Sequence, residues 1–263
     1  MCRWIAYKGQ PVFLEDVVSK PDHSLVHQSL HAEQAKTETN GDGFGLGWYG
    51  ERNEPGLYRE ILPAWSDDNL RNIARHVRAG TFFAHVRAST GTATSRPNCH
   101  PFACGPWMFM HNGQIGGYAT LRRKIENLIP DAYYASRFGT TDSEALFLIA
   151  LARGAGACPV VGMAETLALV RAMMREAGID EPLRFAAAMT DGDNLFAFRW
   201  ASDDKAPTVY YRQEGDDLLI VSEPTDRERQ RWQALPAAHA IILRKGESVR
   251  VAGFEPEAIR LAA

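Results

Sequence analysis

Long hydrophobic runs and an excess of charge of either sign are both missing from this 263-residue chain. No apolar run approaches the roughly 20 residues of a transmembrane helix, and no basic segment followed by an apolar stretch opens the chain as in a secretory signal. The net charge is −3, which argues against a nucleic-acid or anionic-membrane partner. We therefore expect a cytoplasmic protein with neither partner.

Cysteine is also scarce, with four residues: Cys2, Cys99, Cys104 and Cys158. In an intracellular chain we expect them to be thiols rather than disulfides. A zinc site would need ligands drawn from Cys99, His100 and Cys104, completed by His85 or His111. The cysteine spacing is not C-x-x-C and no second pair follows, so we predict no metal and no cofactor.

Repeats, long linkers and low-complexity segments are absent as well. The content of 45% hydrophobic and 23% charged residues is ordinary for a globular protein, and the length suffices for a large buried core. We predict a single domain over residues 1–263.

Hydrophobic patterning predicts strands near both ends of the chain and helices in its middle. Strands are expected at 3–7, 57–62, 81–86 and 107–110, helices at 66–80, 118–128, 142–151 and 163–174, and hairpins at 185–200, 209–221 and 241–251. A turn is expected at Gly9–Pro11. This order favours one α+β domain with helices packed against antiparallel sheets.

Two irregular stretches have competing interpretations. Residues 14–40 are expected to be rich in loops, and their histidines His23, His27 and His31 to be solvated or capping rather than metal ligands. Residues 40–50 alternate glycine with large side chains. That alternation favours a strand approached closely by another backbone over a phosphate-binding loop, which leads into a helix.

Cys2 is the first candidate for chemistry. Removal of Met1 leaves a thiol and a free α-amine on one residue. The amine has a pKa of roughly 7.7–8.0 and the thiolate is the reactive form of cysteine, so one residue supplies nucleophile and base. The alternative is that Cys2 is a small apolar residue at the start of a strand.

Three further segments place polar groups beside predicted strands. Arg87 presents a planar fork suited to a carboxylate, or pairs with an internal acid. Asn112-Gly113 forms a tight turn, or offers two donors to an oxyanion. Thr141 and Glu144 fit a capping box, which leaves Asp142 in the first helical turn and able to accept a substrate ammonium.

Together these segments resemble the class II glutamine amidotransferase domain of the N-terminal-nucleophile hydrolase superfamily. The matching pieces, in order, are Met1-Cys2, His85–Thr90, Asn98–Phe102, His111–Gly113 and Thr141–Glu144. The resemblance implies a four-layer αββα sandwich of two antiparallel sheets between helical layers. It also implies an enzyme that hydrolyses a γ-glutamyl amide.

The same resemblance implies the roles of the site residues. Cys2 would be the nucleophile, with its own α-amine as base, and Asn112 and Gly113 the oxyanion hole. Arg87, supported by Thr90, would hold the glutamyl α-carboxylate.

Asp142 would receive the glutamyl α-ammonium. Gly91 departs from the His or Ala that many amidotransferases have after this threonine, so the resemblance does not imply one of the family's substrate contacts for this chain.

No synthase pattern follows the motifs, so the chain is expected to carry the glutaminase-like half alone. It resembles stand-alone relatives in glutathione degradation and the ergothioneine pathway, which favours a small γ-glutamyl substrate related to thiols. A glutaminase subunit serving a separate synthase or peptidase partner is one alternative. A catalytically silent γ-glutamyl-binding subunit is another.

Overall fold

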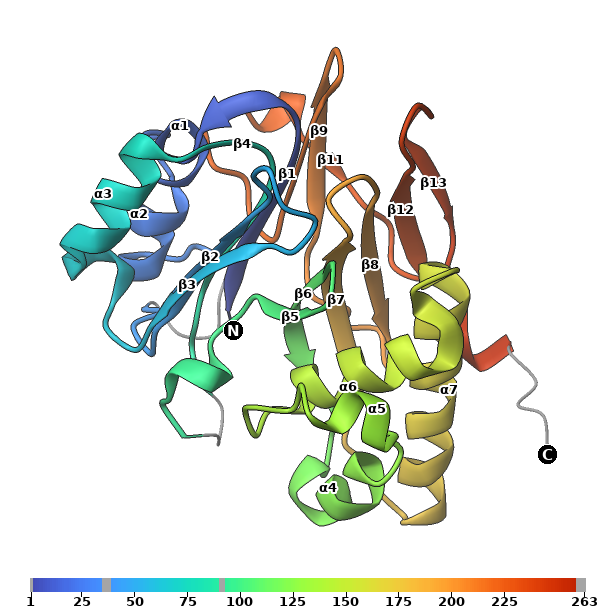
Figure 1. Ribbon diagram of the computed structural model, residues 1–263. Coiled ribbons are helices and arrows are strands. Elements are labelled where there is room, and N and C mark those ends of the chain that lie inside the picture. The colour runs from blue at the N-terminus through green and yellow to red at the C-terminus, as the bar shows by residue number, and fades with distance from the viewer. Residues whose placement is uncertain (1, 35–38, 90–92, 259–263) are drawn as a thin grey trace.

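Two antiparallel β-sheets lie face to face between two layers of helices in this computed structural model, which describes residues 2–34, 39–89 and 93–258 (Figure 1). In order across the first sheet, the strands are β11 (Gln233–Ala234), β9 (Tyr210–Glu214), β10 (Asp217–Val221), β1 (Arg3–Phe13), β4 (Arg78–Val86), β2 (Phe44–Trp48) and β3 (Gly56–Glu60). The second sheet follows the order β13 (Arg250–Gly253), β12 (His239–Leu243), β8 (Leu195–Ala201), β7 (Arg184–Thr190), β6 (Trp107–Gln114) and β5 (Phe102–Cys104).

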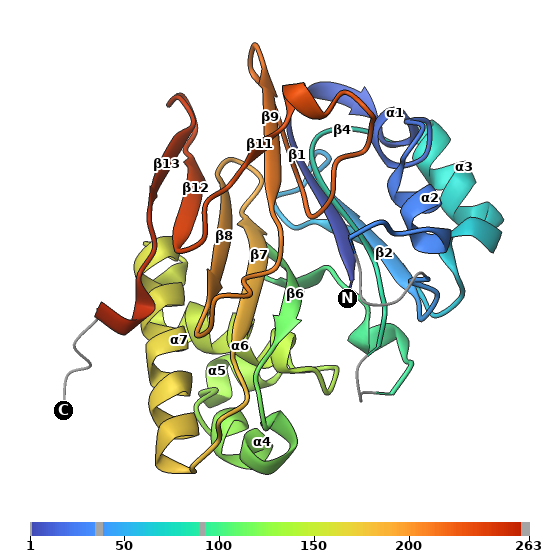
Figure 2. The same ribbon diagram turned by 180° about the vertical axis from the view of Figure 1, so that it is seen from behind.

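Helices cover the outer face of each sheet (Figures 1 and 2). The first sheet carries α1 (Leu14–Val18), α2 (Leu25–Leu30) and α3 (Asp68–His76). The second carries α4 (Tyr118–Glu126), α5 (Asp131–Tyr134), α6 (Asp142–Ala150) and α7 (Pro159–Glu176). Shorter helical turns lie at Ala64–Ser66, Arg96–Asn98, Leu151–Ala155, Arg229–Arg231 and Pro256–Ala258.

Strand alternation explains why the described residues form three hydrophobic cores. In β1, Trp4 and Ala6 face the other sheet, whereas Ile5 and Tyr7 pack toward the first helical layer. Because successive side chains point to opposite faces of a strand, an unbroken apolar run is buried on both faces. The layered α+β architecture expected from the sequence is therefore confirmed.

The start of the chain departs from the sequence prediction in two places. β1 does not turn at Gly9–Pro11 but continues to Phe13, with a register shift against β4 between Lys8 and Val12. A bulge accommodates a proline that a regular ladder excludes. Residues 14–40 are also not merely loops, because they contain α1 and α2.

The helix predicted at 66–80 is shorter than expected. Asp67 caps it by accepting a hydrogen bond from the Leu70 backbone nitrogen at 2.6 Å, and the helix ends at His76. Gly80 does not terminate it, because β4 has already begun at Arg78. None of the described helices is long and apolar enough to cross a membrane. The assignment of residues 1–263 to one domain stays a prediction.

Candidate active site

Cys2 stands directly before β1, a strand that contacts β6 of the other sheet (Figures 1 and 2). Its Sγ lies 3.6 Å from the carbonyl oxygen of Ala88, to which it donates. Burial raises the pKa of the thiol, and the Ala88 contact and the charges of Arg87 and Arg3 offset part of that rise. The thiol therefore needs a base to become a nucleophile at neutral pH.

Asn112 and Gly113 lie inside β6 and pair with Ala186 and Phe185 of β7, so the tight-turn interpretation is wrong. The Nδ2 atom of Asn112 is buried and has no hydrogen-bond partner. A buried amide donor without a partner costs roughly 1–3 kcal/mol. Such a donor is available to a ligand oxygen.

Gly113 has no room for a side chain. A Cβ atom there would lie 1.9 Å from the carbonyl oxygen of Arg184 and 2.5 Å from Nε2 of His111. The close approach of β7 therefore requires glycine at this position.

Arg87 follows β4 and is buried. Its guanidinium donates to the carbonyl oxygens of Asp42 at 3.3 Å and Ala93 at 3.4 Å, and to Ser89 Oγ at 3.1 Å. Its backbone nitrogen donates to the Gly43 carbonyl oxygen at 2.8 Å. These contacts hold the guanidinium in one orientation at the end of the first sheet.

Asp142 is the first residue of α6, on the other side of the site. Its Oδ2 accepts from the Ile115 backbone nitrogen at 2.9 Å, and its Oδ1 accepts from the Ser143 nitrogen at 2.8 Å. Ile115 comes two residues after Gly113. The carboxylate is thus tied to the segment that carries the candidate oxyanion donors.

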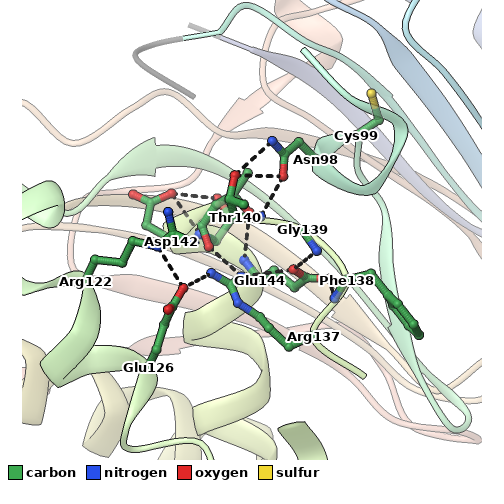
Figure 3. A network of polar contacts seen from close by, with 12 residues as sticks. Asn98, Cys99, Arg122, Glu126, Arg137, Phe138, Gly139, Thr140, Asp142 and Glu144 are labelled. Atoms are coloured by element: carbon green, nitrogen blue, oxygen red, sulfur yellow. Dashed lines mark hydrogen bonds and ion pairs between the residues drawn. The ribbon is translucent and has the colours of Figure 1, made fainter. Parts of the chain in front are cut away.

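The capping box predicted beside Asp142 is half correct. Thr141 Oγ1 accepts from the Glu144 nitrogen at 3.2 Å, as expected for an N-cap. The Glu144 carboxylate accepts instead from the backbone nitrogens of Phe138 and Gly139 and pairs with Arg137 at 2.9 Å (Figure 3). These contacts fix the turn that leads into α6.

Asn98 connects the two sides of the site (Figure 3). Its Nδ2 donates to the Ala93 carbonyl oxygen at 2.8 Å and to Thr140 Oγ1 at 3.1 Å, and its Oδ1 accepts from the Thr140 nitrogen at 2.7 Å. The same Ala93 oxygen accepts from Arg87. The sequence places Asn98 within the Asn98–Phe102 motif but indicates no role for it, because a motif does not reveal which distant loop it contacts.

Three of the buried histidines belong to the motifs that carry the site residues: His85, His100 and His111. The rings of His85 and His100 lie 4.2 Å apart, and all four of their ring nitrogens lack a hydrogen-bond partner. Burial, with Arg87 nearby, lowers the pKa of His85 to about 3, and burial and His85 lower that of His100. His111, whose Nδ1 lies 2.8 Å from Ser143 Oγ, also has a lowered pKa because of burial, although Asp142 opposes it. All three are neutral at pH 7.

Metal ligation has one candidate group within the described ranges: His23, Glu33 and Glu223, whose ligand atoms lie within 4.8 Å of one another. These atoms are engaged within the protein, because Glu223 contacts His23 and Arg3, and Glu33 pairs with Arg229. His27 and His31 are exposed, as expected, whereas His23 is paired. The four cysteines are all free thiols.

Of the six residues with sequence-predicted roles, five belong to the described structure: Cys2, Arg87, Asn112, Gly113 and Asp142. The Ala93–Asn98–Thr140 contacts link Arg87 to Asp142, and Ile115 links Asp142 to Gly113. Thr90, Gly91 and Met1 lie outside the described residues, so the expectations for them stay predictions.

Comparison with known proteins supports one family. A family model described as class-II glutamine amidotransferases matches residues 17–212. The probable glutamine amidotransferase DUG3 of Saccharomyces cerevisiae is 33% identical over 293 residues, covering 93% of this chain and 82% of the yeast protein. The gamma-glutamyl-hercynylcysteine sulfoxide hydrolase of Mycolicibacterium smegmatis is 26% identical over 253 residues, covering 95% of this chain and 98% of that protein.

A solved structure gives the same result. The glutamine aminotransferase class-II domain protein from Silicibacter pomeroyi is 38% identical, with a TM-score of 0.77, and the match covers 97% of this chain and 100% of that one. The αββα sandwich of the N-terminal-nucleophile hydrolase type and the enzyme class that the sequence predicted are both confirmed. The chain belongs to the class II glutamine amidotransferase family.

Proposed function

We propose that this chain hydrolyses a γ-glutamyl amide through a γ-glutamyl thioester on Cys2, once Met1 has been removed. The observation that carries the proposal is the buried, unpartnered Nδ2 of Asn112. It lies on β6, a strand that contacts β1, and Cys2 directly precedes β1. A fold retains such a donor at a cost in stability when it serves a charge that develops during the reaction.

The proposed reaction uses Cys2, Asn112 and Gly113. The α-amine of Cys2 takes the thiol proton, directly or through water, and Sγ attacks the γ-carbonyl carbon. The oxyanion accepts hydrogen bonds from Asn112 and from the backbone of Gly113. The carbon–nitrogen bond then breaks, and the leaving amine or ammonia takes the proton from the α-ammonium. Water hydrolyses the thioester, which releases glutamate and restores the thiol.

Substrate recognition depends on two fixed charges. The guanidinium of Arg87 matches the planar α-carboxylate, and the Asp142 carboxylate matches the α-ammonium. Thr90 supports the carboxylate end in this proposal. Because Asn98 and Thr140 join the supports of both groups, the distance between the charges is set before substrate binds.

For the substrate class, we favour small γ-glutamyl sulfur compounds or peptides over free glutamine. The name of the mycobacterial relative, a hydrolase of a γ-glutamyl sulfur compound, supports this choice. The name of the yeast relative, a probable glutamine amidotransferase, supports the second candidate, a glutaminase that delivers ammonia to a separate partner subunit. The free thiols agree with a cytoplasmic location.

Glutamate release from glutamine, glutathione and γ-glutamyl sulfur compounds tests the proposal. We expect the Met1-processed chain to act on at least one of them, Cys2→Ala to be inactive while folded, and Cys158→Ala, a matched control at a second partly buried thiol, to retain full activity. Turnover of sulfur compounds without turnover of glutamine would exclude ammonia delivery. Full activity of Cys2→Ala would overturn the mechanism, and release from no substrate would favour a silent binding subunit.

A further inference from the structure

We infer that His23, Glu223 and Arg3 form a positioning relay that orients Cys2 for attack; this inference rests on the proposed role of Cys2 as nucleophile. The mechanism proposed above gives no role to residues 23–29, which open with His23 and run into α2. Their first residue, His23, contacts Glu223, which in turn contacts Arg3, the residue after Cys2.

The relay consists of three consecutive contacts. Nη1 of Arg3 donates to the carbonyl oxygen of Cys2 at 3.2 Å. Nε of Arg3 lies 2.8 Å from Oε2 of Glu223. Oε1 of Glu223 lies 2.7 Å from Nε2 of His23.

The two central groups are buried, because the Arg3 side chain is 0% exposed and that of Glu223 is 2% exposed. Burial lowers the pKa of Arg3, and Glu223 counteracts it. Burial alone would raise the pKa of Glu223, but His23, Arg3 and the backbone nitrogens of residues 33 and 34 outweigh it and lower that pKa. Both groups therefore stay charged at neutral pH.

The surrounding backbone holds the relay against the start of β1. The Trp4 nitrogen donates to Ser222 Oγ at 2.9 Å, and the Ser222 nitrogen donates to the Trp4 carbonyl oxygen at 3.1 Å. Gln28 Nε2 donates to the His23 carbonyl oxygen at 2.9 Å and to the backbone carbonyl oxygen of Glu223 at 3.4 Å. The residues on both sides of the ion pair are thereby fixed.

Stability does not explain this arrangement. Desolvation of two charges consumes most of the attraction between them, so well-packed apolar residues often stabilise a core equally well or better. An Arg3 that holds the Cys2 carbonyl oxygen has a different consequence. It fixes the peptide plane after Cys2 and therefore the directions in which the α-amine and the thiol project.

His23 is the member of the relay that reaches solvent. It borders a cavity of about 110 Å³ whose other charged or titratable lining groups are Asp22, His27, Glu33, Glu223, Asp226, Arg227 and Arg229. Removal of its imidazole leaves one oxygen of Glu223 without this partner. Oε1 of Glu223 then keeps only the Glu33 backbone nitrogen at 3.0 Å, while Oε2 keeps the Gln34 nitrogen and Arg3. The carboxylate is held by fewer contacts, so its hold on Arg3, and that of Arg3 on Cys2, weakens.

The test uses the full-length, Met1-processed chain and the variants His23→Ala, His23→Gln and Glu223→Gln. For His23→Ala and Glu223→Gln we expect kcat to fall about 10-fold to 100-fold at unchanged KM, since small misplacements of a nucleophile have effects of this order. Gln keeps an N–H donor toward Glu223, so His23→Gln retains most of the activity. Glu33→Gln is the matched control. It removes a carboxylate of the same cavity but keeps the backbone N–H of residue 33, which donates to the Glu223 carboxylate.

Alkylation of Cys2 by iodoacetamide, followed by mass spectrometry of the N-terminal peptide, provides a readout without substrate. In His23→Ala the rate at pH 7 should fall and the midpoint of its pH profile should rise, because the amine is no longer aligned to take the thiol proton. Altered alkylation in a chain that hydrolyses nothing would support the relay and refute the proposed function. Unchanged kcat and alkylation in folded His23→Ala, or a rise in KM alone, would overturn the relay. If Glu223→Gln fails to fold, the kinetics and alkylation of His23→Ala and His23→Gln test the relay without it.

Discussion

Asn98 and Thr140 hydrogen-bond to each other in both directions: the Thr140 nitrogen donates to Asn98 Oδ1 at 2.7 Å, and Asn98 Nδ2 donates to Thr140 Oγ1 at 3.1 Å. Asn98 also shares the Ala93 carbonyl oxygen with Arg87, and Thr140 lies two residues before Asp142. One side chain thus couples the two charges of the proposed substrate clamp.

Asn98→Ala should raise KM more than it lowers kcat. Loss of three hydrogen bonds lets the two charges move relative to each other, and a buried hydrogen bond to a polar partner contributes about 1 kcal/mol. We expect kcat/KM to fall about 10-fold to 100-fold. Steady-state kinetics with the best γ-glutamyl substrate measure this, with exposed Asn53→Ala as the control. A loss confined to kcat would separate Asn98 from substrate binding.

Asn112→Ala should separate activity from stability. The variant removes the donor to the oxyanion, which typically lowers kcat about 100-fold to 1000-fold. It also removes a buried amide nitrogen that has no partner, so the free energy of unfolding should stay the same or rise. Urea titration beside kinetics checks both effects. A clear loss of stability together with normal kcat would contradict the assignment.

Gly113→Ala should be destabilised by about 3 kcal/mol, because the new Cβ would overlap the Arg184 carbonyl oxygen and either β6 or β7 must shift. Gly50→Ala is the matched control, since a Cβ at Gly50 meets no atom within 4 Å. Urea midpoints of the two variants compare them directly. Equal midpoints would show that the strands separate more easily than the contacts indicate.

Mild acid should destabilise the fold through the buried histidines. The folded-state pKa of His85 is about 3, below its ordinary value, so between these values the unfolded chain binds a proton that the native state does not. Stability is therefore fully present above about pH 6.5 and falls as pH drops toward 3, by about 1.4 kcal/mol per pH unit for each such histidine.

His85→Leu should reduce this slope between pH 6 and 4 by about one proton. Urea unfolding at several pH values gives the slopes. An identical slope in His85→Leu would show that His85 takes up its proton within the native state.

The parts of the fold that sequence predicted are those set by local pattern. The alternation of glycine with large side chains predicted the strand that forms β2, and the hairpin predicted at 185–200 is formed by β7 and β8. Pattern failed where tertiary contacts decide. The Asn112-Gly113 pair is typical of a turn, but it lies within a strand because β7 pairs with it. Pro11 lies within β1 because the register of β1 against β4 shifts there.

The candidate site was predictable residue by residue but not as an assembly. Cys2, Arg87 and Asp142 were recognisable because their chemistry and order resemble a family. The contact of Asn98 with Thr140 and that of Arg3 with Glu223 join residues far apart in the chain, and no periodicity encodes them. These contacts are visible only once the two sheets are packed together.

The most direct test of the account is covalent trapping of the nucleophile. A diazo-oxo-norleucine-type electrophile, which mimics the γ-glutamyl group, should add its mass once per Met1-processed chain, and peptide mapping should place the adduct on the peptide beginning at Cys2. Excess γ-glutamyl substrate should protect against labelling, and Cys2→Ala should not be labelled. An adduct on Cys99, Cys104 or Cys158, or no adduct on an active enzyme, would contradict the assignment of Cys2 as the nucleophile.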